Sequence, residues 1–81
     1  MNEQFVGTTS TGIKLYTNAL TKAAENYAKS LKLKKIRIFI AERENKSKRY
    51  IVVWNGEVVY ETPLYEQIGA GLDFLKITRK S

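Results

Sequence analysis

The sequence of 81 residues contains neither cysteine nor histidine. Without cysteine the chain cannot form a disulfide scaffold or a thiolate metal site. Without histidine it also lacks the most common general base, and the two absences together remove the usual ligands of zinc, copper and iron. No pair of carboxylates, phosphate-binding loop or metal-ligand spacing takes their place. We therefore expect a protein that is not an enzyme and that needs no cofactor and no metal.

Long apolar runs are absent as well. No segment approaches the roughly 20 apolar residues of a membrane-spanning helix, and Met1 to Gly12 lacks the basic and apolar regions of a secretory signal. The hydrophobic fraction of 43% is typical of a globular protein. These features predict one small cytoplasmic domain without membrane contact. We expect it to span residues 11–77, between an N-terminal arm or loop at residues 1–10 and a basic C-terminal tail at residues 78–81.

The positive charge is concentrated in one part of the chain. The formal net charge is +6, from 14 basic and 8 acidic residues. Between Lys29 and Arg49 there are nine basic residues and two acidic ones, Glu42 and Glu44, so this stretch alone carries +7. A local excess of this kind is what a phosphate-binding surface needs. It is also compatible with a solvated face that keeps a small protein soluble.

Residues 11–31 carry apolar side chains at steps of three and four, the period of an amphipathic helix. The stripe consists of Ile13, Tyr16, Leu20, Ala23, Tyr27 and Leu31. Ser10 or Thr11 can cap this helix by accepting from a free backbone N–H. An alternative places a strand at Ile13 to Tyr16 and makes Thr17 the cap of a shorter helix. The unbroken stripe favours the longer helix.

Three strands are predicted in the middle of the chain. Residues 35–42 alternate, with Ile36, Ile38 and Ile40 on one face, and residues 49–54 and 57–62 are rich in β-branched and aromatic side chains. A polar loop separates the first two strands. Asn55 and Gly56 separate the second from the third, and this pair is a strong signal for a tight hairpin because both residues can take a positive φ.

A second helix is predicted from Pro63 to about Ile77, with Thr62 as its cap. Its apolar stripe consists of Leu64, Ile68, Leu72 and Leu75. Gly69 and Gly71 each weaken such a helix by roughly 1 kcal/mol relative to alanine. Their small size can instead allow close packing on the first helix or on the sheet. The expected fold is therefore a small α+β domain of order α-β-β-β-α, with a three-stranded antiparallel sheet.

A two-residue turn fixes the register of the last two strands. The expected opposite pairs are Trp54 with Glu57, Val53 with Val58, Val52 with Val59, Ile51 with Tyr60, and Tyr50 with Glu61. We expect the face with Ile51 and Val53 to pack on the helices, together with the three isoleucines of the first strand. The other face would be open, with its apolar and aromatic area contributed by Arg37, Phe39, Tyr50, Val52, Trp54 and Val59. An exposed patch of this kind marks a binding surface, unless the N-terminal arm or a helix covers it.

From Thr11 to Ile77 the expected order resembles that of the double-stranded-RNA-binding domain, in topology alone. That family carries lysines at the start of its second helix, whereas the matching residues 63–67 here include no basic residue. The family's histidine between the first two strands is also missing, although Arg43, Lys46 and Lys48 make that loop basic. The same order is similar to small toxin ribonucleases of the HicA type, whose chemistry requires a histidine. No family assignment follows, because fold likeness is a weak guide to function.

Our first hypothesis for function is a sequence-tolerant module that binds nucleic acid, either DNA or RNA, without catalysis. The residues expected to contact phosphates are Lys34, Lys35, Arg37, Arg43, Lys46, Lys48 and Arg49. The aromatic side chains expected to stack on bases, or to anchor a partner, are Phe39, Tyr50 and Trp54.

The alternative hypothesis is a protein-interaction module that uses the same aromatic sheet face. It would be a small regulator or inhibitor of a larger protein, of viral or mobile-element origin, or a homodimer.

Overall fold

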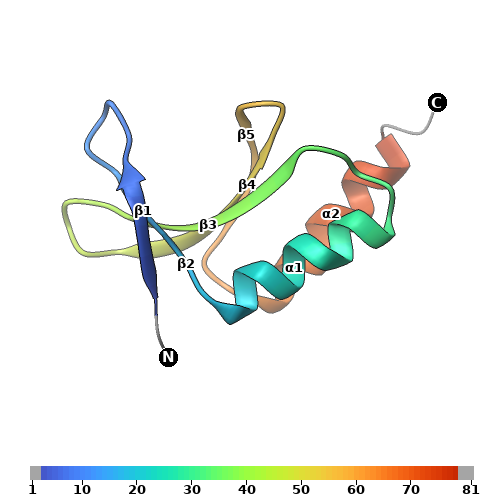
Figure 1. Cartoon of the computed structure of the whole chain (residues 1–81), viewed down its shortest axis with the longest axis horizontal. Coiled ribbons are helices and arrows are strands. Elements are labelled where there is room, and N and C mark those ends of the chain that lie inside the picture. Colours follow the sequence, from blue (N-terminus) through green and yellow to red (C-terminus); the bar gives the residue numbers. More distant parts are fainter. Residues whose placement is uncertain (1–2, 79–81) are drawn as a thin grey trace.

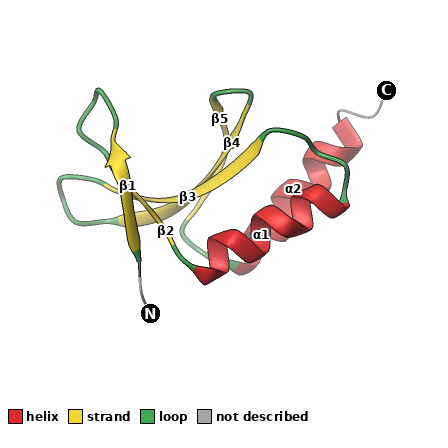
Figure 2. Cartoon of the chain, viewed as in Figure 1, coloured by secondary structure: helices red, strands yellow, loops and turns green. Residues whose placement is uncertain are grey.

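The protein is an antiparallel five-stranded sheet with two helices packed side by side on one of its faces (Figure 1, Figure 2). The computed structural model describes residues 3–78. In chain order the elements are β1 (Gln4–Thr8), β2 (Lys14–Thr17), α1 (Ala19–Ser30), β3 (Ile36–Glu42), β4 (Lys48–Trp54), β5 (Glu57–Thr62) and α2 (Glu66–Thr78). The strands lie in the sheet in the same order as in the chain. The expected α+β class, the antiparallel sheet and the two helices are confirmed, but a sheet of three strands is wrong.

The two additional strands form a hairpin ahead of α1, with β1 in the expected arm and β2 where the long helix was expected to begin. The alternative interpretation, a strand near Ile13 to Tyr16, is the correct one, although the helix cap is Asn18 and not Thr17. Asn18 Oδ1 accepts from Thr21 N, and Thr21 Oγ1 accepts from Asn18 N, both at 3.0 Å. This capping box starts the helix at Ala19. The residues expected to form an arm pair as β1 with β2, whereas residues 79–81 of the expected tail lie outside the described part.

The Asn55-Gly56 hairpin is confirmed, and both residues have positive φ, 56° and 82°. Trp54 lies opposite Glu57, and Val53 lies opposite Val58, as expected. A β-bulge then shifts the register by one residue. Beyond the bulge the expected pairs are wrong: Val52 lies opposite Tyr60, Ile51 opposite Glu61, and Tyr50 opposite Thr62.

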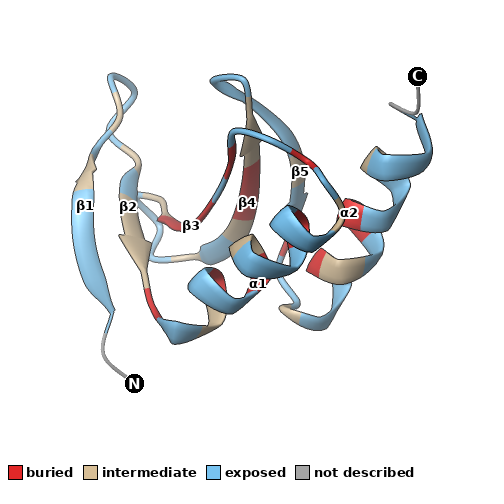
Figure 3. Ribbon diagram, turned by 45° about the vertical axis from the view of Figure 1, so that its right-hand side comes forward, coloured by how far each residue is buried: buried red, intermediate tan, exposed pale blue. Residues whose placement is uncertain are grey.

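The helices cover the opposite face of the sheet from the one expected. In the β3–β4 ladder Ile36 lies opposite Trp54, Ile38 opposite Val52, and Ile40 opposite Tyr50, so these six side chains share a face. That face packs on α1 and α2 in a core formed by Ala24, Ala28, Leu33, Ile36, Ile38, Val52, Ile68 and Leu72. Figure 3 shows buried residues gathered on β3, β4 and the inner sides of both helices, whereas β1 is largely exposed.

The open face of the sheet carries a smaller apolar cluster. Phe39, Ala41 and Ile51 are buried there, with Leu15 and Val53 packed beside them. Both hairpin tips, β1–β2 and β4–β5, rise on this side of β3 (Figure 1). The expectation that Ile51 and Val53 pack on the helices is therefore wrong.

The second helix begins at Glu66, three residues later than expected. Thr62 caps the preceding turn instead, because its Oγ1 accepts from Leu64 N at 3.1 Å. Close packing is confirmed at Gly71, where an added Cβ would lie 2.6 Å from ring atoms of Tyr60 on β5. It is wrong for Gly69, which has no neighbouring atom within 4 Å of such a Cβ. Within residues 3–78 neither helix is long and apolar enough to cross a membrane.

Candidate nucleic-acid interface

The basic residues predicted to contact phosphates do not form one surface. Lys34 and Lys35 precede β3, whereas Lys46 lies in the loop at its other end. A strand of seven residues spans about 20 Å, so β3 holds the two groups apart. Arg37 and Arg49 lie between them on the open face of the sheet.

The group near the β3–β4 loop is largely engaged by carboxylates. Arg43 Nη1 and Arg49 Nε lie 3.0 and 3.6 Å from the same oxygen of Glu61, and Lys48 Nζ lies 3.1 Å from Glu3 Oε1. Its hydrogen bond to Glu3 raises the pKa of Lys48 above its ordinary value. Exposed ion pairs add little stability, but they reduce the positive potential that this end offers to an anion.

The other end of β3 borders a basic groove with a volume of about 640 Å³. We define the basic groove by its lining residues, which are Glu25, Lys29, Lys32, Leu33, Lys34, Lys35, Ile36 and Arg37. None of its four lysines makes an ion pair with another residue among 3–78. Its one carboxylate is engaged, because Glu25 Oε2 accepts from Ile38 N at 2.9 Å and lies 3.7 Å from Arg37 Nε.

The groove arises where α1 ends beside an unpaired edge of β3. The β2–β3 ladder runs only from Ile40 to Glu42, so the first residues of β3 have no strand on that side. After α1, Leu33 N donates to Ala28 O at 3.1 Å and Lys32 N donates to Lys29 O at 2.9 Å. This is the Schellman pattern that ends many helices. It places lysines on both sides of the turn that leads into β3.

The aromatic residues predicted to stack do not share a face. Tyr50 lies on the helix-covered face, in edge-to-face contact with Tyr65 at 5.7 Å between ring centroids. Trp54 lies on the same face, and its Nε1 donates to Lys34 O at 2.7 Å. Phe39 lies on the open face, where it is 9% exposed and the Arg37 guanidinium sits 5.2 Å from its ring centroid. The common outer face expected for these side chains is therefore wrong, and stacking by them stays a prediction.

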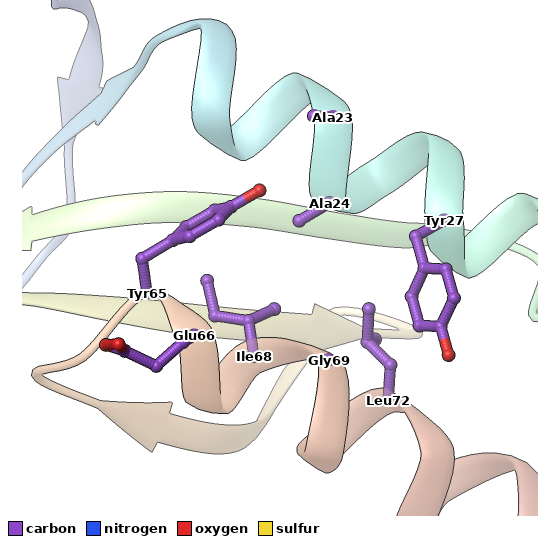
Figure 4. A pocket seen from close by; sticks show the side chains of 8 residues that line it. All are labelled: Ala23, Ala24, Tyr27, Tyr65, Glu66, Ile68, Gly69 and Leu72. Carbon is purple, nitrogen blue, oxygen red and sulfur yellow. The ribbon is translucent and has the colours of Figure 1, made fainter.

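A second hollow, of about 280 Å³, lies between the two helices (Figure 4). Its floor is small or apolar, with Ala24, Ile68 and Leu72, and no basic side chain lines it. At one end Tyr27 donates its hydroxyl hydrogen to Asp73 Oδ1 at 2.5 Å. This bond raises the pKa of Tyr27 above its ordinary value of 10.0, so the stabilising contact persists below pH 10 and is lost as Tyr27 ionises at higher pH. Because no basic side chain lines it, this second hollow does not suit an anion.

Sequence reasoning missed Lys29 and Lys32 as groove residues. Both belong to the basic stretch, but a helix end is a favourable place for any cation. The signal that separates them from the other lysines is spatial, since it depends on the turn between α1 and β3. Among residues 3–78 there is no cluster of three side chains that could hold a metal.

No family model, no curated protein and no solved structure matches this chain. The choice of site therefore rests on charge and geometry alone.

Proposed function

We propose that this protein is a non-enzymatic module that binds nucleic acid by holding the phosphate backbone in the basic groove. The observation that supports this proposal is the balance of charge there: four lysines and one arginine face a single carboxylate that is already engaged. Lysines that contact phosphates release condensed counterions, which gives affinity without sequence preference. A cytoplasmic location agrees with this function and stays a prediction.

The proposal predicts a steep loss of affinity with salt. The slope of log K against log salt is negative, and we expect Lys29→Gln/Lys34→Gln to reduce its magnitude by about 1.5, because each phosphate contact contributes about 0.7 to 0.9. Fluorescence anisotropy with labelled DNA and RNA probes measures the slope. The only tryptophan, Trp54, bonds to the Lys34 carbonyl, so its emission should change when the groove is occupied.

The matched control removes two lysines elsewhere. Lys22 and Lys76 are exposed, lie on the helices and do not line the groove. Lys22→Gln/Lys76→Gln lowers the net charge equally but should keep most of the slope. Affinity that ignores salt, or equal losses in the two variants, would contradict the proposal.

A second candidate function is a protein-interaction module. The observation in its favour is the open face of the sheet, where a hollow of about 350 Å³ lies over Ala41 and Ile51. Val58 borders this hollow and is 57% exposed. If the partner is a second copy, we expect Val58→Asp to shift the sedimentation equilibrium from dimer to monomer without unfolding the chain. A wild-type protein that stays monomeric at high concentration would argue against the homodimer.

A further inference from the structure

Three lysines adopt a backbone conformation that normally belongs to glycine. Four non-glycine residues among 3–78 have a positive φ: Asn55, Lys32 at 68°, Lys35 at 63° and Lys46 at 69°. Asparagine visits this region readily, whereas a lysine Cβ is crowded there by the backbone. Asn55 thus follows the usual preference, and the three lysines do not. Two of those lysines, Lys32 and Lys35, line the basic groove.

The helix end does not require a lysine at position 32. This residue follows the last turn of α1 in the Schellman pattern, at the place where glycine is most common. A cation near a helix C-terminus is favourable, but Lys29 already supplies one in the last turn. The helix end therefore explains the left-handed conformation at position 32 but not the choice of lysine there. Strained residues that persist in a fold tend to gather at binding sites.

The turn that carries these lysines is fixed from both sides. Leu33 is buried in the core, 7% exposed, and its N–H bonds to Ala28 O. At the next residue of the same turn, the Lys34 carbonyl accepts from the Trp54 indole. Lys32 and Lys35 therefore stand on a backbone that cannot easily rearrange, and a preorganised site loses less entropy when it binds.

The groove contains nothing that would hold a base. Its lining includes no aromatic side chain. Tyr50 and the neighbouring Trp54 both pack against the core between sheet and helices, and the Trp54 indole is bonded to the Lys34 carbonyl. Base stacking uses an aromatic or arginine plane, and the one guanidinium among the lining residues, that of Arg37, already lies 5.2 Å from the Phe39 ring centroid and 3.7 Å from Glu25.

We propose that the basic groove recognises the phosphodiester backbone alone, without its bases, and that Lys32 and Lys35 are its anchoring cations. This inference rests on the proposed function and specifies the part of the ligand that is bound. The left-handed conformation holds both lysines beside the groove at the expense of stability. Replacing them by glycine should therefore raise the stability of the fold and lower its affinity for the backbone.

The first test compares two labelled single strands of equal length, one normal and one built entirely of abasic sites. We expect their affinities to agree within about twofold, because each stacked base would add about fivefold or more. If neither strand binds, the proposed function itself fails. If the normal strand binds and the abasic strand does not, only the present inference is overturned.

The second test replaces both anchors by glycine. We expect Lys32→Gly/Lys35→Gly to raise the melting temperature by about 5 °C or more, since both positions favour glycine. The same variant should lose about tenfold or more in affinity for both strands, and the magnitude of its slope of log K against log salt should fall by about 1.5. Lys32→Asn/Lys35→Asn, which also tolerates the conformation, should show the same loss, and Lys22→Gln/Lys76→Gln should not. Unchanged affinity, or a lower melting temperature in the glycine variant, would overturn the inference.

Discussion

Val52→Asp is expected to unfold the protein at room temperature, whereas Val53→Asp should leave it folded. The two valines are neighbours on β4, but Val52 is 0% exposed within the core between sheet and helices. An aspartate there would bury an unpaired carboxylate, at a cost of several kcal/mol. A domain of this size has about 5 kcal/mol to lose. Val53 is only partly buried, on the open face, where a carboxylate can reach water.

Far-UV circular dichroism and urea denaturation of the two variants measure this difference. Val52→Ala and Val53→Ala serve as controls that change volume without charge, and we expect the first to cost about 2 kcal/mol and the second less than about 1 kcal/mol. A folded Val52→Asp together with an unfolded Val53→Asp would mean that the helices cover the other face of the sheet.

The hairpin at Asn55-Gly56 could be predicted because its signal is local. Both residues must take positive φ, and few residue pairs do so readily. The bulge one step away has no such signal, since Val58 and Val59 are equally suited to a strand. One unpaired residue moves every later side chain of β5 to the other face. Glu61 thus lies opposite Ile51 on the open face, beside Arg43, and not opposite Tyr50.

The N-terminal hairpin was hidden by two periods that coincide over a short segment. Ile13 and Tyr16 are three residues apart, as in a helix, but Ile13 and Leu15 also alternate, as in a strand. The reciprocal hydrogen bonds of Asn18 and Thr21 decide between helix and strand. They start the helix at Ala19, after Ile13 and Tyr16. Capping propensity alone ranks Asn18 above Thr17 but gives it no priority over Ser10.

The sequence predicts that the candidate site is basic, but it does not predict where in the fold the site lies. The basic stretch from Lys29 to Arg49 is continuous in sequence, yet β3 separates its two ends, and Glu61 and Glu3 engage one of them. Which cations stay without a carboxylate depends on contacts between residues far apart in the chain. The positive φ values of Lys32 and Lys35 likewise arise from how α1 meets β3, and residue preferences would have predicted glycine there.

Gly71→Ala is expected to destabilise the protein by about 1 to 2 kcal/mol, and Gly69→Ala to stabilise it by up to about 1 kcal/mol. Both replacements favour the helical conformation equally. At Gly71, however, the new methyl group would lie 2.6 Å from two ring atoms of Tyr60, and the ring must shift within the packed face. At Gly69 the methyl group meets no atom within 4 Å.

Urea denaturation of the two variants gives the difference, and a double-mutant cycle identifies its cause. In a Tyr60→Ala background the clash partner is absent, so Gly71→Ala should become neutral or stabilising, like Gly69→Ala. If Gly71→Ala instead destabilises the protein equally with and without the tyrosine ring, the close approach of α2 to β5 is not what requires glycine at this position. If Gly71→Ala stabilises the wild-type background, the helix does not approach the sheet as closely as the contact with Tyr60 indicates.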